Sequence, residues 1–325
     1  MNRRSLITSF ASAYALSLSS RLWAQQEWPT QPIRWIVPYP AGGGTDVLAR
    51  ALAGSMRETL GQPLIIDNRP GASTNIGAEL TARAKPDGYT IMSGDNAAMF
   101  FNEFLFAKLP YKPDGDFTYI GAIGRFPMAL VVHPEFAARS IPELLILAKK
   151  DAGKINYASP GNGSPHHLAM ELFKNRTGTD LTHVPYRGAA PAMQDVMGGQ
   201  VPCMFLDLAS GLPNIQANKF RVLAIGSAQR SQLLPEVPTL AEAGVKDSEV
   251  FAFQGLLGPA NMPPEVVAKL NGALNKALAS ESVVKRFTDF GLEIQPGTGE
   301  AFKRVTRAEA KRWGPIIQNA GIRLD

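Results

Sequence analysis

A glycine-rich turn near the N-terminus has residue types suited to holding an anion. It reads Pro38-Tyr39-Pro40-Ala41-Gly42-Gly43-Gly44-Thr45-Asp46 and joins an expected strand to an expected helix. Glycine has no Cβ atom, so this backbone can turn sharply and come close to a ligand. The first N–H groups of the helix lack internal partners and, with the helix dipole, favour a carboxylate or phosphate. The carboxylate of Asp46 can accept from some of the same donors, and a turn that merely links strand to helix is the alternative.

A second turn, Tyr157-Ala158-Ser159-Pro160-Gly161-Asn162-Gly163-Ser164-Pro165-His166-His167, repeats this arrangement. Ser164 fits the N-cap of a helix and Pro165 fits its first position. The hydroxyls of Ser159 and Ser164 can reach an anion. Because open α/β sheets bind ligands at the carboxyl ends of parallel strands, we expect the two turns to face each other across a cleft.

A third segment, Val184-Pro185-Tyr186-Arg187-Gly188-Ala189-Ala190-Pro191, precedes another expected helix. Arg187 either pairs with a ligand carboxylate or is a solvated or structural arginine. Asp207 ends a further expected strand, where it either accepts hydrogen bonds from a ligand amine or hydroxyl or caps a helix. Both residues are candidates for ligand binding.

Other chemistries have weaker signals. His166 and His167 are adjacent, so on a helix they point about 100° apart, and no Cys/His cluster accompanies them; we expect no metal. The chain has neither a Walker loop nor a Gly-x-Gly-x-x-Gly turn, so we expect no cofactor. An exported hydrolase that uses Ser164 with His167 remains the alternative function, although the Gly-x-Ser-x-Gly elbow is absent.

The first 24 residues have the layout of a signal peptide. Asn2-Arg3-Arg4 is basic, residues 6–18 are mostly apolar, and Leu22-Trp23-Ala24 offers a small residue for cleavage. The apolar part is shorter than the roughly 20 residues that span a membrane. The arginine pair leaves the Sec and twin-arginine routes both open. We therefore expect a periplasmic protein that is cleaved near Ala24.

Removal of the leader lowers the formal net charge from +5 to +2, because it holds three arginines and no acid. A net charge this small does not indicate nucleic acid as a partner. Cys203 is the only cysteine, so no intramolecular disulfide can form, and its apolar neighbours indicate a buried core position. About 300 residues remain, which exceeds the usual single core and favours two domains.

Short apolar runs alternate with helical patterns, which predicts an α/β fold with mostly parallel sheets. Apolar residues recur at spacing four from Leu48, Leu168 and Val266, as amphipathic helices require. The expected strands are residues 33–37, 64–67, 89–93, 119–123, 129–132, 155–157, 181–184, 203–206, 221–225 and 251–257. A strand near 119–123 would lead into a second domain and 251–257 would lead back. The predicted domains are thus residues 25–124 with 251–325, and residues 125–250.

These segments together resemble the substrate-binding receptors of tripartite tricarboxylate transporters, the Bug-type periplasmic family. The resemblance covers essentially the whole mature chain. It rests on the first turn continued through Asp46-Val47-Leu48-Ala49-Arg50, and on Asn68-Arg69-Pro70-Gly71-Ala72, Pro86-Asp87-Gly88-Tyr89-Thr90, Pro185-Tyr186-Arg187-Gly188 and Leu234-Pro235-Glu236-Val237-Pro238-Thr239.

The resemblance implies a two-domain Venus-flytrap that captures a small organic acid in its cleft and delivers it to transporter subunits or a sensor. We expect a monomer and no catalysis. The implied ligand-binding residues are Ala41, Gly42, Gly43, Gly44, Thr45 and Asp46 on one side and Ser159, Gly163 and Ser164 on the other. Contacts that vary with substrate are expected at Asp95, Asn96, Ala97 and Asp207. Tyr39, His167 and Arg187 complete the candidate set.

Ala41 stands where glycine is common in the family, and the chain departs from the family pattern in two further places. Ser73 and Thr74 stand in a turn where glycines are usual, which alters the expected shape of the cleft. Residues 97–101, Ala-Ala-Met-Phe-Phe, are unusually apolar for their segment. This second departure indicates either core packing or a less polar ligand.

Overall fold

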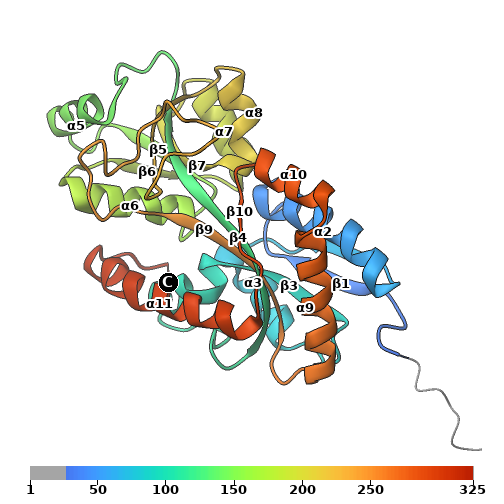
Figure 1. Cartoon of the computed structure of the whole chain (residues 1–325). Helices are drawn as coiled ribbons and strands as arrows, with labels where there is room; N and C mark the ends of the chain where they lie inside the picture. The colour runs from blue at the N-terminus through green and yellow to red at the C-terminus, as the bar shows by residue number, and fades with distance from the viewer. Residues whose placement is uncertain (1–26, 325) are drawn as a thin grey trace, which may run out of the picture.

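The structure is a computed structural model that describes residues 27–324. The predicted signal peptide therefore lies outside the described residues. Two lobes are joined by a pair of long strands, and the C-terminal helix returns to the lobe that contains the beginning of the described chain (Figure 1). No helix among residues 27–324 is long and apolar enough to cross a membrane.

The strands follow the apolar runs of the sequence. Their bounds are β1 Ile33–Val37, β2 Leu64–Asn68, β3 Thr90–Asp95, β4 Phe117–Val132, β5 Asn156–Ser159, β6 Thr182–Pro185, β7 Cys203–Asp207, β8 Arg221–Ile225, β9 Phe251–Pro259 and β10 Glu293–Ile294. β10 was not predicted, because two residues leave no periodic pattern. Cys203 is fully buried, as predicted, and burial raises the pKa of its thiol to about 12.

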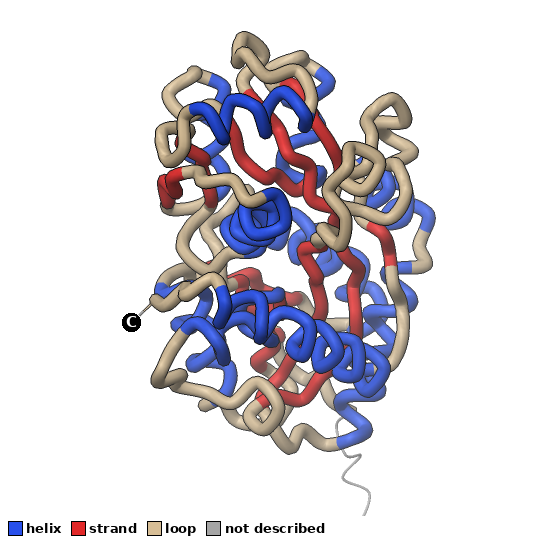
Figure 2. The backbone as a smooth tube through the Cα atoms, turned by 90° about the vertical axis from the view of Figure 1, so that its left-hand side faces the viewer, coloured by secondary structure: helices blue, strands red, loops and turns tan. Residues whose placement is uncertain are grey.

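Helices lie outside the strands of both lobes (Figure 2). Their bounds are α2 Gly44–Leu60, α3 Asn75–Ala82, α4 Asn102–Leu105, α5 Ile141–Lys150, α6 Pro165–Thr177, α7 Ala189–Met197, α8 Leu208–Gln216, α9 Pro264–Leu278, α10 Glu281–Asp289 and α11 Gly299–Asn319, with a 3-10 turn η2 at Ala72–Thr74 and a π-helical turn η3 at Ala97–Phe101. The predicted stripes that begin at Leu48, Leu168 and Val266 are buried in α2, α6 and α9.

The strand order is β2-β1-β3-β9-β4-β7-β5-β6, and β8 and β10 also pair with β4. β4 belongs to both lobes, because residues 117–127 pair with β9 and residues 128–132 pair with β7. β9 runs back beside it in the opposite direction. This course supports the predicted division into residues 25–124 with 251–325 and residues 125–250, which we retain as a proposal.

The two-domain α/β fold class is confirmed, but two details of the strand prediction are wrong. The strands expected at 119–123 and 129–132 are one strand of 16 residues. Pro127, which has no N–H to donate to a sheet ladder, lies where β4 changes partners. The sheets are also mixed: β1 and β5 pair in parallel with their neighbours, whereas β4 and β9 pair antiparallel, since one strand leaves a lobe and the other returns.

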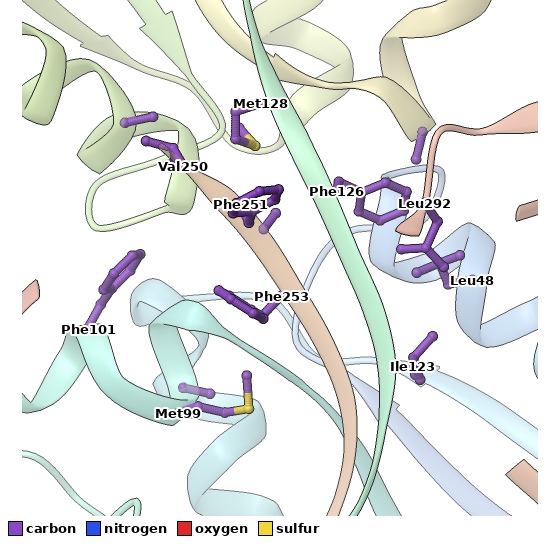
Figure 3. Close-up of a cluster of buried hydrophobic side chains, with 14 of the residues drawn as sticks. Leu48, Met99, Phe101, Ile123, Phe126, Met128, Val250, Phe251, Phe253 and Leu292 are labelled. Carbon is purple, nitrogen blue, oxygen red and sulfur yellow. The ribbon is translucent and has the colours of Figure 1, made fainter. Parts of the chain in front are cut away.

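Apolar side chains pack along both crossing strands where they pass between the lobes. Figure 3 shows Phe126 and Met128 of β4 with Phe251 and Phe253 of β9. The η3 turn packs into the same core, and each of its residues, 97–101, is at most 1% exposed. The core-packing interpretation of this apolar segment is therefore confirmed.

Candidate functional site

A cavity with about 650 Å³ of empty space, its solvent-filled mouth included, lies between the two lobes. Its walls come from the turn before α2, the N-terminal end of α6 and the turn before α7, and its floor comes from β3, β4 and β9. Eight of the predicted ligand-binding residues line it: Tyr39, Ala41, Gly43, Gly44, Thr45, Asp95, Arg187 and Asp207. The first and second turns, which were predicted to face each other, therefore meet at this cavity, since Pro160, Pro165 and His166 of the second turn also line it, and the third turn joins them.

The N-terminal ends of three helices line this cavity. α2 begins after Gly43 and α7 begins after Gly188, and neither N-cap has a side chain to accept from the first N–H groups. α6 is capped by Ser164, whose hydroxyl accepts from the backbone N–H of His167, with Pro165 at its first position as predicted. The uncapped ends of α2 and α7 come from opposite lobes, and their free N–H groups and dipoles favour an anion between them.

Arg187 is an unpaired cation at the edge of this cavity. The residue is exposed, and among residues 27–324 its guanidinium forms neither an ion pair nor a hydrogen bond. A guanidinium without an internal partner is available to a carboxylate, which it can bind through two parallel hydrogen bonds. The side chain thus adds a full positive charge to the partial charges of the helix ends.

Asp207 faces the beginning of α2 from the other lobe and is already bound within its own lobe. It is the N-cap of α8, accepting from the backbone N–H of Ser210 at 3.0 Å and from the Ser210 hydroxyl at 2.7 Å, and its Oδ2 lies 3.0 Å from His166 Nε2. Burial alone would raise the pKa of Asp207, but the hydrogen bonds from His166 and Ser210 outweigh it and lower the pKa. His166 lines the cavity, although the sequence analysis considered it only as a possible metal ligand.

The floor of the cavity combines a carboxylate, an amide and an aromatic ring. Asp95 ends β3 and its backbone pairs with that of Gln254 on β9, while Phe126 on β4 pairs with Ala252. Gln254 and Phe126 were missed by the sequence reasoning. The available signal was one polar residue, Gln254, inside the apolar run of residues 251–257.

A second cavity, with about 870 Å³ of empty space, adjoins the first and shares Tyr39, Pro40, Pro160, Arg187 and Gly188 with it. It is lined by the strained turn at 71–74, by the predicted residues Ala97 and Ser164, and by Asn162. The hydroxyl of Ser73 donates to the backbone oxygen of Asn162 across this space. The cleft between the lobes therefore holds two adjoining cavities with a shared wall.

Three predicted residues of the first lobe, Gly42, Asp46 and Asn96, lie away from both cavities. Asp46 accepts from the Gly42 N–H, from Arg50 Nε and from Asn68 Nδ2, each at 2.9 Å. The Asp46 carboxylate thus accepts the hydrogen bond of the Gly42 N–H, as the position of Asp46 at the start of the helix suggested. Asn96 is fully buried and bonds to the backbone of Phe251 and Phe253. These side chains hold the turn and β9 in place.

Three predicted residues of the second lobe also lie outside the cavity linings. The ring of His167 stacks on His183 at 4.0 Å, and its Nδ1 accepts from the Gly163 N–H. Ser159 lies 2.6 Å from His183 Nε2 and is fully buried. The helix register explains this placement, because adjacent residues point in different directions: His166 lines the cleft and His167 faces the interior.

The arrangement of Ser164 and His167 differs from that of a nucleophile and its base. Within residues 27–324 the Ser164 hydroxyl is hydrogen bonded to the backbone of His167, not to its ring. The ring accepts at Nδ1, so its neutral form carries the proton on Nε2. Burial lowers the pKa of His167 to about 4, with the positive charge of Lys174 adding to the effect.

Comparison with known proteins places this geometry in a family. The model of the tripartite tricarboxylate transporter family receptor, TctC, matches residues 48–322. A Pseudomonas protein described as a UPF0065 protein in the tcbD-tcbE intergenic region is 36% identical over 318 residues, which is 98% of this chain and 94% of that protein.

Two solved structures have the same fold and similar sequences. An R. palustris protein solved with adipate superimposes with a TM-score of 0.88 at 35% identity, over 92% of this chain and 100% of the other. The periplasmic binding protein BugD superimposes with a TM-score of 0.87 at 33% identity, over 91% and 100%.

Proposed function

Because this chain belongs to the tripartite tricarboxylate transporter receptor family, we propose that it captures a small organic carboxylate in its cleft by domain closure, for uptake or sensing. The observation that carries the proposal is the convergence of the uncapped ends of α2 and α7 with the unpaired Arg187 on one cavity. A relative solved with adipate supports a carboxylate as the ligand.

Closure follows from where the donors lie. Burying a carboxylate is costly unless its oxygens find hydrogen-bond donors. The donors near Gly44 belong to one lobe, and those near Ala189 and Arg187 belong to the other. The full set surrounds a ligand only when the lobes approach, so ligand binding favours the closed form.

The test is a thermal-shift screen of the refolded mature chain against mono-, di- and tricarboxylates and their carboxamide analogues. Refolding removes any ligand acquired during expression. A ligand at 100 times its Kd stabilises the native state by about 2.7 kcal/mol. We expect such a shift with an acid, no shift with its amide, and a smaller radius of gyration in solution scattering. If no acid produces a shift or compaction, the proposal is wrong.

The proposal includes export to the periplasm, which suits a family of periplasmic receptors. The basic start, apolar stretch and small residue at Ala24 support it. Fractionation of expressing cells, with mass spectrometry of the intact protein, checks both location and cleavage. We expect periplasmic protein that lacks the first 24 residues. Two separate treatments distinguish the two export routes: deletion of Arg3 and Arg4 tests the twin-arginine route, and a Sec inhibitor tests the Sec route.

We also propose that the protein is a receptor and not an enzyme. The rival hydrolase requires the Ser164 hydroxyl to donate to the His167 ring. That ring is stacked on His183 and bonded to the Gly163 N–H instead. When the protein is incubated with aromatic and aliphatic esters, we expect no hydrolysis that is lost in the Ser164→Ala variant. Turnover that depends on Ser164 would contradict the receptor assignment.

A further inference from the structure

The floor of the cavity places Asp95 and Gln254 side by side. Their backbones are paired in the antiparallel β3–β9 ladder, so their side chains leave the same face of the sheet within about 5.5 Å of each other. Both line the cavity, yet Asp95 is only 1% exposed and Gln254 only 5% exposed. Two buried polar side chains thus meet at the base of the site.

Asp95 is a buried acid without a cationic partner. Its Oδ2 accepts from the Tyr39 hydroxyl at 2.5 Å and its Oδ1 accepts from the Ala98 N–H at 3.0 Å. No Lys, Arg or His of the described chain forms an ion pair with it, in contrast to Asp207, which has His166. Burial raises the pKa of Asp95, because the loss of water around the carboxylate outweighs its hydrogen bonds from Tyr39 and Ala98.

Gln254 is an unpaired amide at the same place. Its side chain makes no hydrogen bond to any residue in the range 27–324. The residue is 5% exposed and lines the cavity, so its amide is accessible to a group that arrives there. Its oxygen is a further acceptor beside the carboxylate of Asp95.

Two aromatic rings add to the negative character of this end. Tyr39 and Phe126 line the cavity next to Asp95 and Gln254. The faces of such rings attract a cation within about 6 Å. The floor therefore offers a carboxylate, an amide oxygen, a phenol oxygen and aromatic faces, whereas the helix ends and Arg187 offer positive charge.

We propose that this floor binds a positively charged nitrogen, so that the ligand is an amino acid or another small carboxylate that carries an ammonium group. This inference rests on the proposed carboxylate-binding function of the same cleft. The ammonium group would donate to Asp95, to the oxygen of Gln254 and to the Tyr39 oxygen. Its positive charge would supply the partner that Asp95 lacks. A carboxylate without the nitrogen leaves Asp95 uncompensated.

The first experiment compares acids that differ only by the amine. Calorimetric titration of the refolded mature chain would use leucine against 4-methylpentanoate, phenylalanine against 3-phenylpropanoate and glutamate against glutarate. We expect at least one amine-bearing acid to bind more tightly than its partner by about tenfold or more, a ratio that calorimetry resolves readily. Equal or tighter binding of every amine-free acid would overturn the inference and leave the carboxylate function standing. Binding of neither class would overturn both.

The second experiment tests Asp95 itself. Asp95→Asn keeps the shape and the acceptor for the Ala98 N–H but removes the charge. We expect the preference for the amine-bearing acid to fall about tenfold, because hydrogen bonds to charged groups are the strong ones. The control is Asp87→Asn on an exposed turn of the same lobe, where Asp87 accepts from the Tyr89 N–H in the same manner.

A second variant covers the case in which Asp95→Asn fails to fold. Gln254→Leu removes the amide at nearly constant volume, and the Gln254 side chain has no hydrogen bond to lose within the described part of the chain. We expect the same loss of preference with an unchanged thermal midpoint. A preference retained in a folded Asp95→Asn or Gln254→Leu protein would overturn the assignment of this floor.

Discussion

The hydroxyl of Ser73 donates a 2.6 Å hydrogen bond to the backbone oxygen of Asn162 and so connects one lobe to the other. Ser73 lies in a run of three non-glycine residues with positive φ, at 47°, 51° and 75° for residues 72–74. Each such residue costs on the order of 1 kcal/mol or more. Asn102 donates to the Ser73 oxygen at 2.7 Å and holds the strained turn in place. The turn is thus fixed where it bridges the cleft.

Ser73→Ala should weaken closure without unfolding the lobe. The variant loses one interlobe hydrogen bond, worth about 1 kcal/mol, which corresponds to a several-fold loss of ligand affinity. We expect a larger radius of gyration in solution scattering and a higher Kd. Ser282→Ala, an exposed serine of α10, is the matched control and should change neither quantity. An unchanged radius and affinity for Ser73→Ala would show that this bond does not hold the lobes together.

Gly44→Ala should prevent full closure at the anion end. A Cβ atom at Gly44 would lie 2.9 Å from Asp207 Oδ1 and 3.4 Å from the Cβ of Ala209, both in the opposite lobe. Asp207 cannot easily move away, because Ser210 and His166 hold its carboxylate. We expect affinity to fall by about tenfold or more, measured by calorimetry against the identified ligand.

The control for Gly44 lies in the same helix. A Cβ atom at Gly54 would meet nothing within 4 Å. Gly54→Ala should raise the free energy of unfolding by up to about 1 kcal/mol and leave affinity unchanged. If both variants bind the ligand as the parent does, the contact between Gly44 and Asp207 has no role in closure.

Arg187→Gln should reduce carboxylate affinity and leave stability intact. The guanidinium has no partner within the described chain, so its loss breaks no internal bond. We expect about a tenfold higher Kd for the ligand, with a weaker dependence on ionic strength, because the guanidinium charge has been removed. Arg57→Gln, also exposed and far along α2 from the cleft, should have no effect on binding. Equal affinity of parent and Arg187→Gln would place the ligand carboxylate elsewhere.

Stability should fall as the pH is lowered from about 6.5 toward 4. Burial lowers the pKa of His167 from 6.5 to about 4 and that of the stacked His183 to about 3. Well above pH 6.5 neither ring is charged in the native or the unfolded state, so the free energy of unfolding does not depend on their titration. Below pH 6.5 the two histidines bind protons in the unfolded chain but stay neutral in the native protein. Lowering the pH therefore favours unfolding until the pKa of the native ring is reached.

Urea unfolding at about pH 7.5 and about pH 5 measures this loss, to which His167 contributes up to about 2 kcal/mol, because pH 5 lies about 1.5 units below its unfolded pKa. His167→Asn removes the titrating group and keeps an acceptor for the Gly163 N–H. Its stability should depend less on pH than that of the parent, although its stability at neutral pH is lower because ring packing is lost. An identical dependence in both proteins would contradict the buried, neutral assignment of His167.

The positions of the turns could be predicted from the sequence, because the residues that form a turn are close together in the chain. The three glycines before Thr45, and the Ser164-Pro165 start of α6, specify backbone geometry within a few residues. Asp95 was named as a residue to inspect, yet its importance depends on Tyr39 and Gln254, which are distant in sequence. His166 and His167 were indistinguishable in the sequence, and only the rotation of α6 relative to the cleft separates the lining residue from the buried one.

By itself the sequence determined the α/β alternation, the amphipathic stripes, the helix starts and the family, because each depends on residue type at short spacing. The tertiary structure decided that one strand crosses both lobes at Pro127 and which side chains of each turn face the cleft. It also decided that Asp95 lies beside Gln254, with no ion-pair partner in residues 27–324. These features depend on register between strands that are more than 150 residues apart for the β3–β9 pair. Local pattern carries no information about such register, since it is fixed only when the two lobes pack around β4 and β9.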